Sequence, residues 1–492
     1  MKAPALERVG ADFPTLAVVG GGLAGMAAAW TAAERGFRVE LFERAKTLGG
    51  RAGSFVDPKT GATTDYCQHA AMGCCTALLD FCRRAGIDDC FQRTDRLHFI
   101  GPDGRRCDAA PSRLLPAPLH LLPGLAKLRY LTPGERLKIA RALRQLTKSK
   151  NNSRGLTAPG EETRNPSISR RLLAAGYCPD DGLCCDDDLD CEDVGSEPVG
   201  DWLRRHGQSQ QAIDRFWSPV LVGALAETVD HASLTAARKV FRDGFLASRD
   251  ASDLLLPRAP LAEIFNERLG RRLAERGVEV HLKSLVRRIE GDRRSAHAIV
   301  LADGRRREFG FVIVAVPWRK VRSLLADELN AAMPALESVE KIAPAAITAV
   351  HLWFDRPVVP LPHAVLIGQL SQWVFAERQN DSAAVQHCQV VISAYHRMER
   401  RTHDELLYKV LGELRAVWPA VGEAELLHRR VIVQPAAVFS CLPGANRFRP
   451  LQRTPVPNLA LAGDWTATGW PGTMEGAVRS GALAVEALHD AV

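Results

Sequence analysis

A glycine-rich run near the N-terminus has the residue types and spacing of a phosphate site. It follows a short apolar stretch, Leu16 to Val19, and leads into an alanine-rich segment that ends near Gly36. Such glycines permit a tight turn, a close approach of the backbone to a pyrophosphate, and packing of a helix on a strand. The first amides of that helix would point at the anion. The residues assigned to this site are Gly20, Gly22, Leu23, Ala24 and Gly25.

A carboxylate follows this run at the spacing of a ribose ligand. The stretch from Phe37 to Phe42 alternates as a second strand and delivers Glu43. This acid lies about twenty residues beyond the glycines, where it can accept hydrogen bonds from the hydroxyls of an adenosine ribose. We include the neighbouring Arg44 among the expected contacts. Strand, turn, helix, strand and acid together predict a dinucleotide-binding unit, which both NAD and FAD would fit.

A second glycine pair decides between the two dinucleotides. The sequence Leu48-Gly49-Gly50-Arg51-Ala52 comes directly after the second strand. It resembles the GG motif of the FAD-binding amine oxidase and carotenoid desaturase superfamily. The resemblance implies that Gly49, Gly50 and Arg51 lie along the phosphate and ribityl part of a flavin. We therefore expect FAD, held noncovalently because no residue near the glycine-rich loop demands a covalent link.

Two segments in the middle of the chain are predicted to return to the same domain. The stretch from Arg276 to Val280 is typical of a helix end followed by a strand, and the superfamily resemblance implies that Val286 holds the adenine through its backbone. The run from Phe311 to Val316 is apolar and β-branched, as in a buried strand, and Pro317 ends it.

The last strand and helix bring the C-terminus to the cofactor. The run from Leu459 to Trp465 is a buried strand with Asp464 at its carboxyl end, which is the edge where open α/β sheets bind ligands. The helix predicted over Thr473 to Leu488 would direct its N-terminal dipole at the electron-rich end of a reduced flavin. The expected contacts here are Gly463, Asp464, Glu475, Gly476 and Ala477.

The fold class that follows is α/β, with an α+β second domain. The first domain is Rossmann-like and of the glutathione reductase type, as in amine oxidases and phytoene desaturases, and a substrate-binding domain is interleaved with it. The FAD-binding domain is expected at 14–104, 266–325 and 431–492, and the substrate domain at 105–265 and 326–430.

Composition excludes several classes of protein. With 492 residues, 46% of them hydrophobic and 25% charged, the chain is large enough for two globular domains. The formal charge is +7, but the sequence lacks the dense runs of Lys and Arg that are typical of a nucleic-acid arm, so no nucleic-acid partner is expected. The uncharged stretch from Pro14 to Ala33 is long enough to suggest a signal peptide, but its glycines fit the nucleotide site instead.

The cysteines indicate the compartment and bear on metal binding. The chain has 12, several of them adjacent, which suits free thiols in the cytoplasm better than a disulfide framework. Cys178, Cys184, Cys185 and Cys191 match no zinc spacing and have no accompanying histidine. No metal is expected.

Two stretches of the second domain stand apart in composition. The stretch at about 111–148 joins an apolar, proline-containing part to a basic helix. This pattern indicates peripheral contact with an anionic membrane, on the cytoplasmic face of the inner membrane, or alternatively a core helix with a solvated basic face. The stretch at 148–200 is first rich in Asn and Ser and then acidic, so a flexible insertion is expected there.

Several motifs narrow the resemblance to the hydroxysqualene dehydroxylase family, which is also described as squalene-associated FAD-dependent desaturase. They are Asp65-Tyr66-Cys67-Gln68-His69, the run from Leu255 to Leu261, and the run from Glu475 to Gly481. The family implies reductive removal of the allylic hydroxyl of hydroxysqualene, giving squalene for hopanoids, sterols or C30 carotenoids. It also implies a prenyl-lipid substrate and association with other enzymes of squalene synthesis.

That reaction needs an apolar tunnel and a proton donor for the departing hydroxyl. His69 is the first candidate for the donor, because it follows a loop that approaches the flavin; Asp65 and Glu227 are alternatives, and His69 could instead be structural. The tunnel could be lined by aromatic residues that could equally be plain core: Phe216, Trp217, Trp353, Phe354, Trp373 and Phe375.

Three other functions remain open at this point. A squalene or carotenoid (phytoene-type) desaturase would use the same flavin in the opposite electron direction. A flavin amine oxidase is less favoured, since it would need an aromatic cage and usually a lysine near the flavin, and we find no convincing cage. A non-catalytic flavoprotein that binds prenyl-lipid enzymes is the third.

Overall fold

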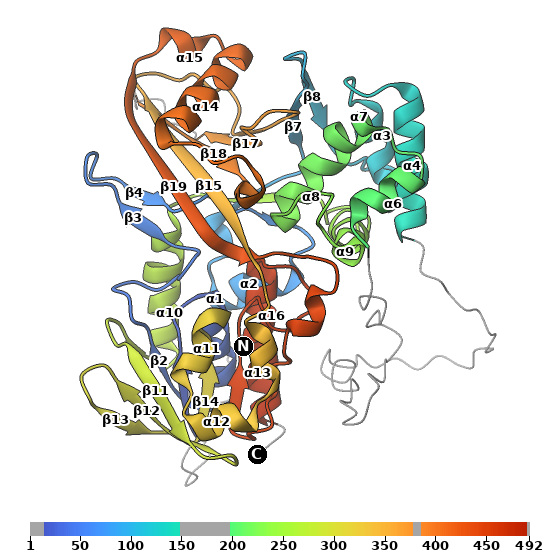
Figure 1. Cartoon of the computed structure of the whole chain (residues 1–492). Helices are drawn as coiled ribbons and strands as arrows, with labels where there is room; N and C mark the ends of the chain where they lie inside the picture. The colour runs from blue at the N-terminus through green and yellow to red at the C-terminus, as the bar shows by residue number, and fades with distance from the viewer. Residues whose placement is uncertain (1–13, 148–196, 377–384, 490–492) are drawn as a thin grey trace, which may run out of the picture.

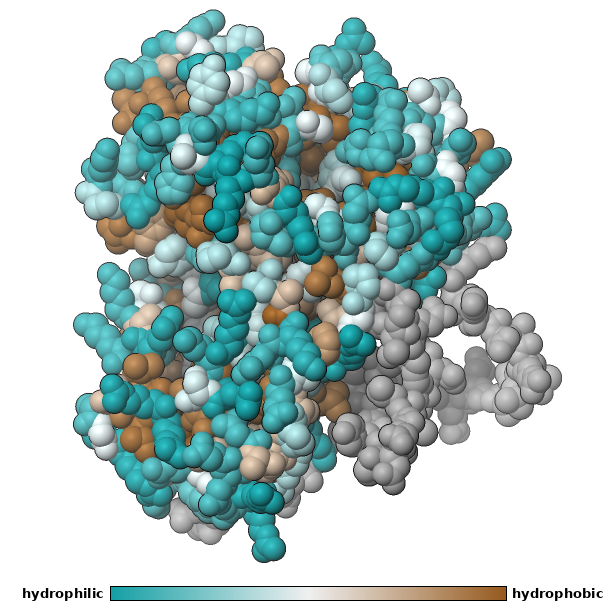
Figure 2. All heavy atoms as spheres, viewed as in Figure 1, coloured by the Kyte–Doolittle hydropathy of each residue, from teal (hydrophilic) through white to brown (hydrophobic). Residues whose placement is uncertain are grey.

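The computed structural model describes residues 14–147, 197–376 and 385–489. Most of the predicted insertion at 148–200, including Cys178, Cys184, Cys185 and Cys191, lies outside the described residues. Figure 1 shows two layers of structure joined by two long strands, with a group of helices beside the upper layer. In Figure 2 hydrophilic side chains cover most of the visible face, and hydrophobic side chains form small groups between them.

A five-stranded parallel sheet lies at the centre of the lower layer, in the order β10-β2-β1-β14-β20. Apolar side chains bury β1 and β14 on both faces, as parallel sheets with helices on each side require. This sheet confirms the predicted α/β class. The strands are β1 Thr15–Val19, β2 Arg38–Phe42, β10 Glu279–His281, β14 Phe311–Val314 and β20 Leu459–Leu461.

The first and last helices of the chain pack against each other on this sheet. Helix α1 (Leu23–Glu34) is buried along most of its length, and α16 (Met474–His489) lies against it. At Gly481 a Cβ atom would come within 2.4 Å of the carbonyl oxygen of Ala24, so glycine is needed for this approach. The other helices of this layer are α2 Thr76–Ala85, the π-helical η5 Ala262–Leu269, and α10 Gly270–Glu275.

A small antiparallel sheet and three short helices complete the lower layer. The sheet has the order β11-β12-β13, from β11 Val286–Gly291, β12 Ala296–Leu301 and β13 Arg306–Glu308. The strand predicted to run to Val316 ends at Val314, and Pro317 is the N-cap of α11. The helices are α11 Trp318–Leu324, α12 Asp327–Ala332 and α13 Ala335–Val339.

The upper layer is a seven-stranded sheet in the order β19-β15-β18-β17-β16-β7-β8. Two strands of this sheet lie across or before the predicted domain boundaries: β19 spans the boundary at residue 430, and β7 comes before the boundary at residue 104. The chain therefore passes between the layers a few residues away from the predicted positions. The strands are β7 Leu97–Ile100, β8 Arg106–Ala109, β15 Pro344–Phe354, β16 His363–Leu366, β17 Trp373–Ala376, β18 Gln386–Ile392 and β19 Leu426–Phe439.

Helices cover both flanks of the upper sheet (Figure 1). On one flank lie α14 (His403–Val417), which begins with a capping box of Thr402 and Glu405, and α15 (Ala420–Glu423). On the other flank lie α3 Leu122–Ala126, α4 Pro133–Thr147, α6 Val199–Arg205, α7 Gln210–Ala212, the π-helical η4 Ile213–Trp217, α8 Ser218–Leu225 and α9 Leu234–Gly244. Among the described residues, no helix combines the length and apolar character needed to cross a bilayer.

Short elements link the two layers. A hairpin of β3 (Ser54–Val56) and β4 (Thr63–Asp65) extends toward the upper sheet, where the carboxylate of Asp57 accepts hydrogen bonds from His428 and Arg430 of β19. A three-stranded sheet has the order β5-β9-β6, from β5 Ala71–Met72, β6 Phe91–Thr94 and β9 Leu254–Pro257. One-turn helices are η1 Asp88–Cys90, η2 Leu119–Leu121, η6 Tyr395–Arg397 and η7 Ala445–Phe448.

Candidate active site

The glycine-rich run forms the turn between β1 and α1 that the sequence predicts. Gly20 has φ +115°, and a Cβ atom at Gly25 would come within 1.8 Å of the carbonyl oxygen of Gly20, so both positions require glycine. Gly22 is the N-cap of α1 and makes no side-chain cap. A Cβ at Gly22 meets no atom within 4 Å, so open space lies at the start of the helix, where Leu23 and its neighbours present backbone amides.

Glu43 is buried at the end of β2 and supports the same turn. One of its carboxylate oxygens accepts a hydrogen bond from the amide of Gly21 at 2.7 Å, and the other accepts one from the amide of Ala45 at 2.7 Å. Its backbone carbonyl accepts a bond from the amide of Ser284, which brings the start of β11, with the buried Val286, beside it. Arg44 follows Glu43 on the exposed surface.

The GG motif pairs with the glycine-rich turn. The amide of Gly49 donates to the carbonyl of Gly21 at 2.9 Å, and Gly49 forms a parallel bridge with Gly22. A Cβ atom at Gly50 would lie 3.1 Å from the Cα of Gly22, so the two loops approach each other without side chains between them. Sequence reasoning expected both loops at the cofactor but did not find their direct pairing.

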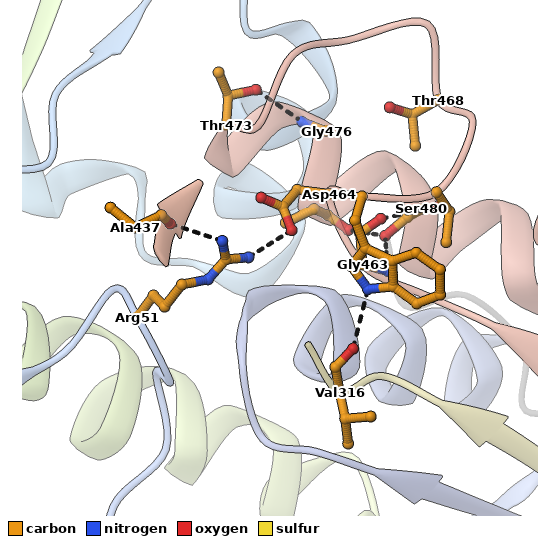
Figure 3. A network of polar contacts seen from close by, with 12 residues as sticks. Arg51, Val316, Ala437, Gly463, Asp464, Thr468, Thr473, Gly476 and Ser480 are labelled. Atoms are coloured by element: carbon orange, nitrogen blue, oxygen red, sulfur yellow. Dashed lines mark hydrogen bonds and ion pairs between the residues drawn. The ribbon is translucent and has the colours of Figure 1, made fainter. Parts of the chain in front are cut away.

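Arg51 and Asp464 join the N-terminal and C-terminal parts of the site (Figure 3). A guanidinium nitrogen of Arg51 lies 2.5 Å from Oδ1 of Asp464, and another donates to the carbonyl of Ala437 on β19 at 2.8 Å. The side chain of Asp464 is 3% exposed and that of Arg51 is 39% exposed. Asp464 is thus held at the carboxyl edge of the sheet, as predicted, with its charge balanced by Arg51.

The segment after β20 requires glycine at position 463. Gly463 has φ +145°, and a Cβ there would come within 2.2 Å of the indole nitrogen of Trp465. That nitrogen donates to the carbonyl of Val316 at 3.0 Å, and the amide of Gly463 donates to the hydroxyl of Ser480 at 2.8 Å (Figure 3). Sequence reasoning did not single out Trp465 or Ser480 for these roles, because their partners lie far away in sequence or on another element.

The start of α16 contacts the start of α2 through Glu475. The carboxylate of Glu475 is fully buried and accepts hydrogen bonds from the amides of Ala77 and Leu78 at the start of α2, and from Arg479. Its side chain therefore caps α2, and the expected flavin contact at Glu475 stays a prediction. Thr473 accepts hydrogen bonds from the backbone amides of the next two predicted residues. The amide of Gly476 donates to the hydroxyl of Thr473, and the amide of Ala477 donates to the backbone carbonyl of Thr473.

These features fit FAD. The open space at Gly22 and the amides at the start of α1 suit a pyrophosphate, and Glu43 is placed for the adenosine ribose. Arg51 and Asp464 would hold the phosphate and ribityl part. Burial and the nearby charge of Asp65 raise the pKa of Cys67 to about 12, so its thiol stays protonated and is a poor nucleophile for attachment to a flavin.

His69 is half-buried, and its environment defines its protonation. Its Nδ1 lies 2.8 Å from the carbonyl oxygen of Cys67, so Nδ1 carries the proton and Nε2 is left as an acceptor. Burial lowers the pKa of His69; the bond to Cys67 opposes this change, and the charge of Arg51 adds to it. His69 can therefore donate a proton from Nε2 only when it is converted to imidazolium.

The other two candidate acids have structural partners. Oδ1 of Asp65 accepts hydrogen bonds from the hydroxyl of Ser54 and from the amide of Leu261, next to the start of η5. Glu227 is fully buried and is bonded to His396, Arg397 and Ser440. Burial raises the pKa of Glu227, but the bonds from Arg397 and Ser440 outweigh this effect, and the net shift is downward. These contacts favour the ionised form of Glu227, and its role as a proton donor stays a prediction.

An apolar pocket of about 550 Å³ lies among α3, α4, α8 and α9 and the strands β7 and β8. Its walls are mainly leucine and phenylalanine, and Arg141 and Arg144 of α4 also line it. Of the aromatic residues expected at a tunnel, Phe216 lines this pocket. The others lie in the core or stack on neighbouring rings: Trp217, Trp353, Phe354, Trp373 and Phe375.

Replacement of Gly22 by alanine is expected to weaken FAD binding without lowering the stability of the apoprotein. Since a methyl group at Gly22 meets no protein atom within 4 Å and the backbone there is extended, we expect Gly22→Ala to keep the thermal stability of the apoprotein. The methyl would occupy the space for the pyrophosphate, so the Kd for FAD should rise tenfold or more, about 1.4 kcal/mol. Titration of FAD fluorescence measures this.

Gly412→Ala is the matched control, because a Cβ at Gly412 in α14 also meets nothing within 4 Å and lies far from the site in sequence. Its Kd for FAD should equal that of the wild type. Unchanged FAD affinity in Gly22→Ala would contradict the assignment of this turn to the pyrophosphate.

Comparison with known proteins agrees with this geometry. The family described as flavin containing amine oxidoreductase matches residues 23–489. The hydroxysqualene dehydroxylases of Sinorhizobium fredii and Rhodopseudomonas palustris are 26% and 27% identical to this chain, over 95% and 96% of it and 97% of each relative. The zeta-carotene desaturase of Synechocystis sp. is 22% identical, over 96% of both chains.

Solved structures show the same fold. Cyclohexylamine oxidase from Brevibacterium oxydans superimposes with a TM-score of 0.67 at 17% identity, over 97% of this chain and 99% of its own. Putrescine oxidase bound to putrescine gives a TM-score of 0.64 at 16% identity, over 97% and 99%. With the nucleotide site described above, the matches lead to one conclusion. The chain belongs to the flavin containing amine oxidoreductase family and is an FAD-dependent oxidoreductase.

Proposed function

We propose that this protein is a hydroxysqualene dehydroxylase. The observation that carries the proposal is the end-to-end similarity to relatives of that name, which extends over 95% or more of this chain and 97% of theirs. The motifs around Asp65 to His69 and Glu475 to Gly481 lie within residues 23–489, which the family model matches. The product would be squalene, for hopanoid, sterol or C30 carotenoid biosynthesis.

The apolar pocket supports a prenyl-lipid substrate. Its volume of about 550 Å³ falls in the range typical of small-molecule sites, and its leucine and phenylalanine walls suit a hydrocarbon chain. Such a site must exclude water, since water would capture an allylic cation formed from the substrate. A chain held among α3, α4 and α9 would be shielded on several sides.

The reaction breaks the C–O bond of the allylic alcohol and forms a C–H bond at the same carbon. Reduced FAD, when bound, supplies the hydride that forms the new C–H bond, and the hydroxyl leaves as water after it takes a proton. The chain must therefore deliver one proton to the hydroxyl oxygen and keep other water away. His69 is the candidate that we favour for this donor, since Glu227 is bonded to Arg397 and Oδ1 of Asp65 is bonded within the fold.

A single anaerobic experiment tests the reaction. We expect photoreduced enzyme to form squalene from hydroxysqualene in proportion to the flavin reoxidised, as followed by absorbance and mass spectrometry. Gly22→Ala, reduced under the same conditions, is the control for catalysis by free flavin. Reduction of the oxidised flavin by squalene or a carotene, without any turnover of hydroxysqualene, would show the proposal to be wrong.

That second outcome defines the alternative function, an FAD-dependent squalene or carotenoid desaturase. The observation that favours it is the similar full-length match to desaturases, including the zeta-carotene desaturase of Synechocystis sp.. A flavin amine oxidase is less supported, because the amine oxidases compared are 17% identical or less and share only the fold.

The role of His69 predicts a pH dependence. Because its pKa is lowered and only the imidazolium can donate from Nε2, turnover should rise as the pH falls through 6.5 and below. His69→Gln should keep FAD but lose turnover by about 10² to 10⁴, the range for general acid catalysis. His403→Gln, at an exposed residue of α14, is the control. Full turnover by a FAD-loaded His69→Gln enzyme would remove His69 from the mechanism.

We also propose that the pocket opens toward an anionic membrane. Leu119 and Leu122 both line the pocket and are 48% and 44% exposed, and Leu114 nearby is 91% exposed. Arg141 and Arg144 line the same pocket. Exposed leucines can enter the interface of a bilayer while guanidinium groups attract anionic lipid headgroups. This contact would place the enzyme on the cytoplasmic face of the inner membrane, near other enzymes of squalene synthesis.

Flotation with liposomes tests the membrane contact. We expect binding to anionic vesicles and less binding to zwitterionic ones, with a fall of severalfold in Leu119→Ser/Leu122→Ser because apolar burial is lost. The double variant Leu427→Ser/Leu451→Ser is matched in exposure, at 49% and 45%, and should bind as the wild type does. Equal loss in both variants, or no binding by the wild type, would contradict the proposal.

A further inference from the structure

A buried arginine lies behind the cofactor side of the site. Arg449 is 8% exposed and precedes β20 by ten residues. Its guanidinium faces the connection between β20 and α16, residues 462–473, which contains no helix or strand. Backbone groups in such a connection cannot be paired by a sheet ladder, so they need other partners.

The guanidinium of Arg449 supplies these partners. Its donors reach four backbone carbonyls at 2.6 to 3.3 Å, those of Asp464, Trp465, Thr466 and Trp470. It also bonds the side-chain oxygens of Asn446 at 3.0 Å and Thr468 at 3.3 Å. The planar guanidinium has five donors in a fixed arrangement, which lets one side chain gather several acceptors.

The acceptors come from both ends of the connection. Asp464 to Thr466 follow β20 directly, whereas Trp470 lies just before the turn into α16. One rigid group bonded to both ends fixes the distance between the strand and the helix. The side chain of Asp464 forms the ion pair with Arg51 (Figure 3).

Neighbours of Arg449 reinforce the same contact. The side-chain amide of Gln452 donates to the hydroxyl of Thr466 at 2.8 Å, and the amide of Ala467 donates to the carbonyl of Pro450 at 2.8 Å. The guanidinium also lies 4.5 Å from the ring centre of Phe439 at the end of β19. Arg449 therefore ties the connection to the upper sheet as well as to the segment that precedes β20.

We propose that Arg449 is a positioning residue for FAD. It holds the backbone of Asp464 and the approach to α16 in the arrangement that the flavin requires, and it acts through those residues without contact with the cofactor. The proposal needs only the FAD site, so it holds for a dehydroxylase and for a desaturase alike.

The test compares Arg449→Met and Arg449→Lys for FAD affinity and for the stability of the apoprotein. Arg449→Met should raise the Kd for FAD tenfold or more, because the carbonyls lose their shared donor. Arg449→Lys keeps the charge but has three donors on a flexible stem, so it should restore part of the affinity and give an intermediate Kd. Bound flavin in both variants should show a less structured visible absorption band at saturating FAD.

Arg447→Met is the control, since Arg447 is exposed and lies two residues away; its Kd and spectrum should match the wild type. A lower melting temperature of the Arg449 apoproteins with FAD affinity and spectrum unchanged would assign Arg449 to stability alone and overturn the proposal. If Arg449→Met does not fold, Arg449→Lys and Gln452→Leu test the proposal in its place. Kd values for FAD within twofold of the wild type in both variants would also overturn the proposal.

Discussion

The close approach of backbones without side chains is the constraint on which the rest of this structure depends. Gly20 and Gly25 let α1 start directly at the end of β1, and Gly481 lets α16 pack on α1. Larger residues at these positions would collide with backbone carbonyls, which cannot move aside as a side chain can. The direction of α1, the open space before its first amides and the position of the C-terminal helix all follow from these contacts.

Local patterns explain why the cofactor half of the fold could be predicted. The strand, glycine turn and helix at residues 16–35 and the acid at Glu43 lie within one short segment, where spacing alone determines which groups meet. The strand that carries Asp464 was recognisable from its apolar run for the same reason. The α/β class and the FAD cofactor therefore followed from the sequence.

Long-range partners explain what the sequence could not predict. Glu475 is in a motif that we expected next to the cofactor, and its carboxylate caps α2, almost 400 residues earlier in the chain. The contacts of Glu227 with Arg397 and Ser440, which lie about 170 and 213 residues further along the chain, also could not be predicted. Arg449 carries no recognisable motif, because its partners are backbone carbonyls whose positions no residue type reveals.

The dependence of the first helices on the last one has a consequence for biosynthesis. The helix α2 is capped by Glu475, and α1 is covered by α16, so both early helices lack these partners until residues 474–489 have left the ribosome. Strand β20, at one edge of the parallel sheet, is also made late. The FAD site is therefore complete only after residues 459–489 have been synthesised, because Asp464 and the cover of α1 both come from that segment.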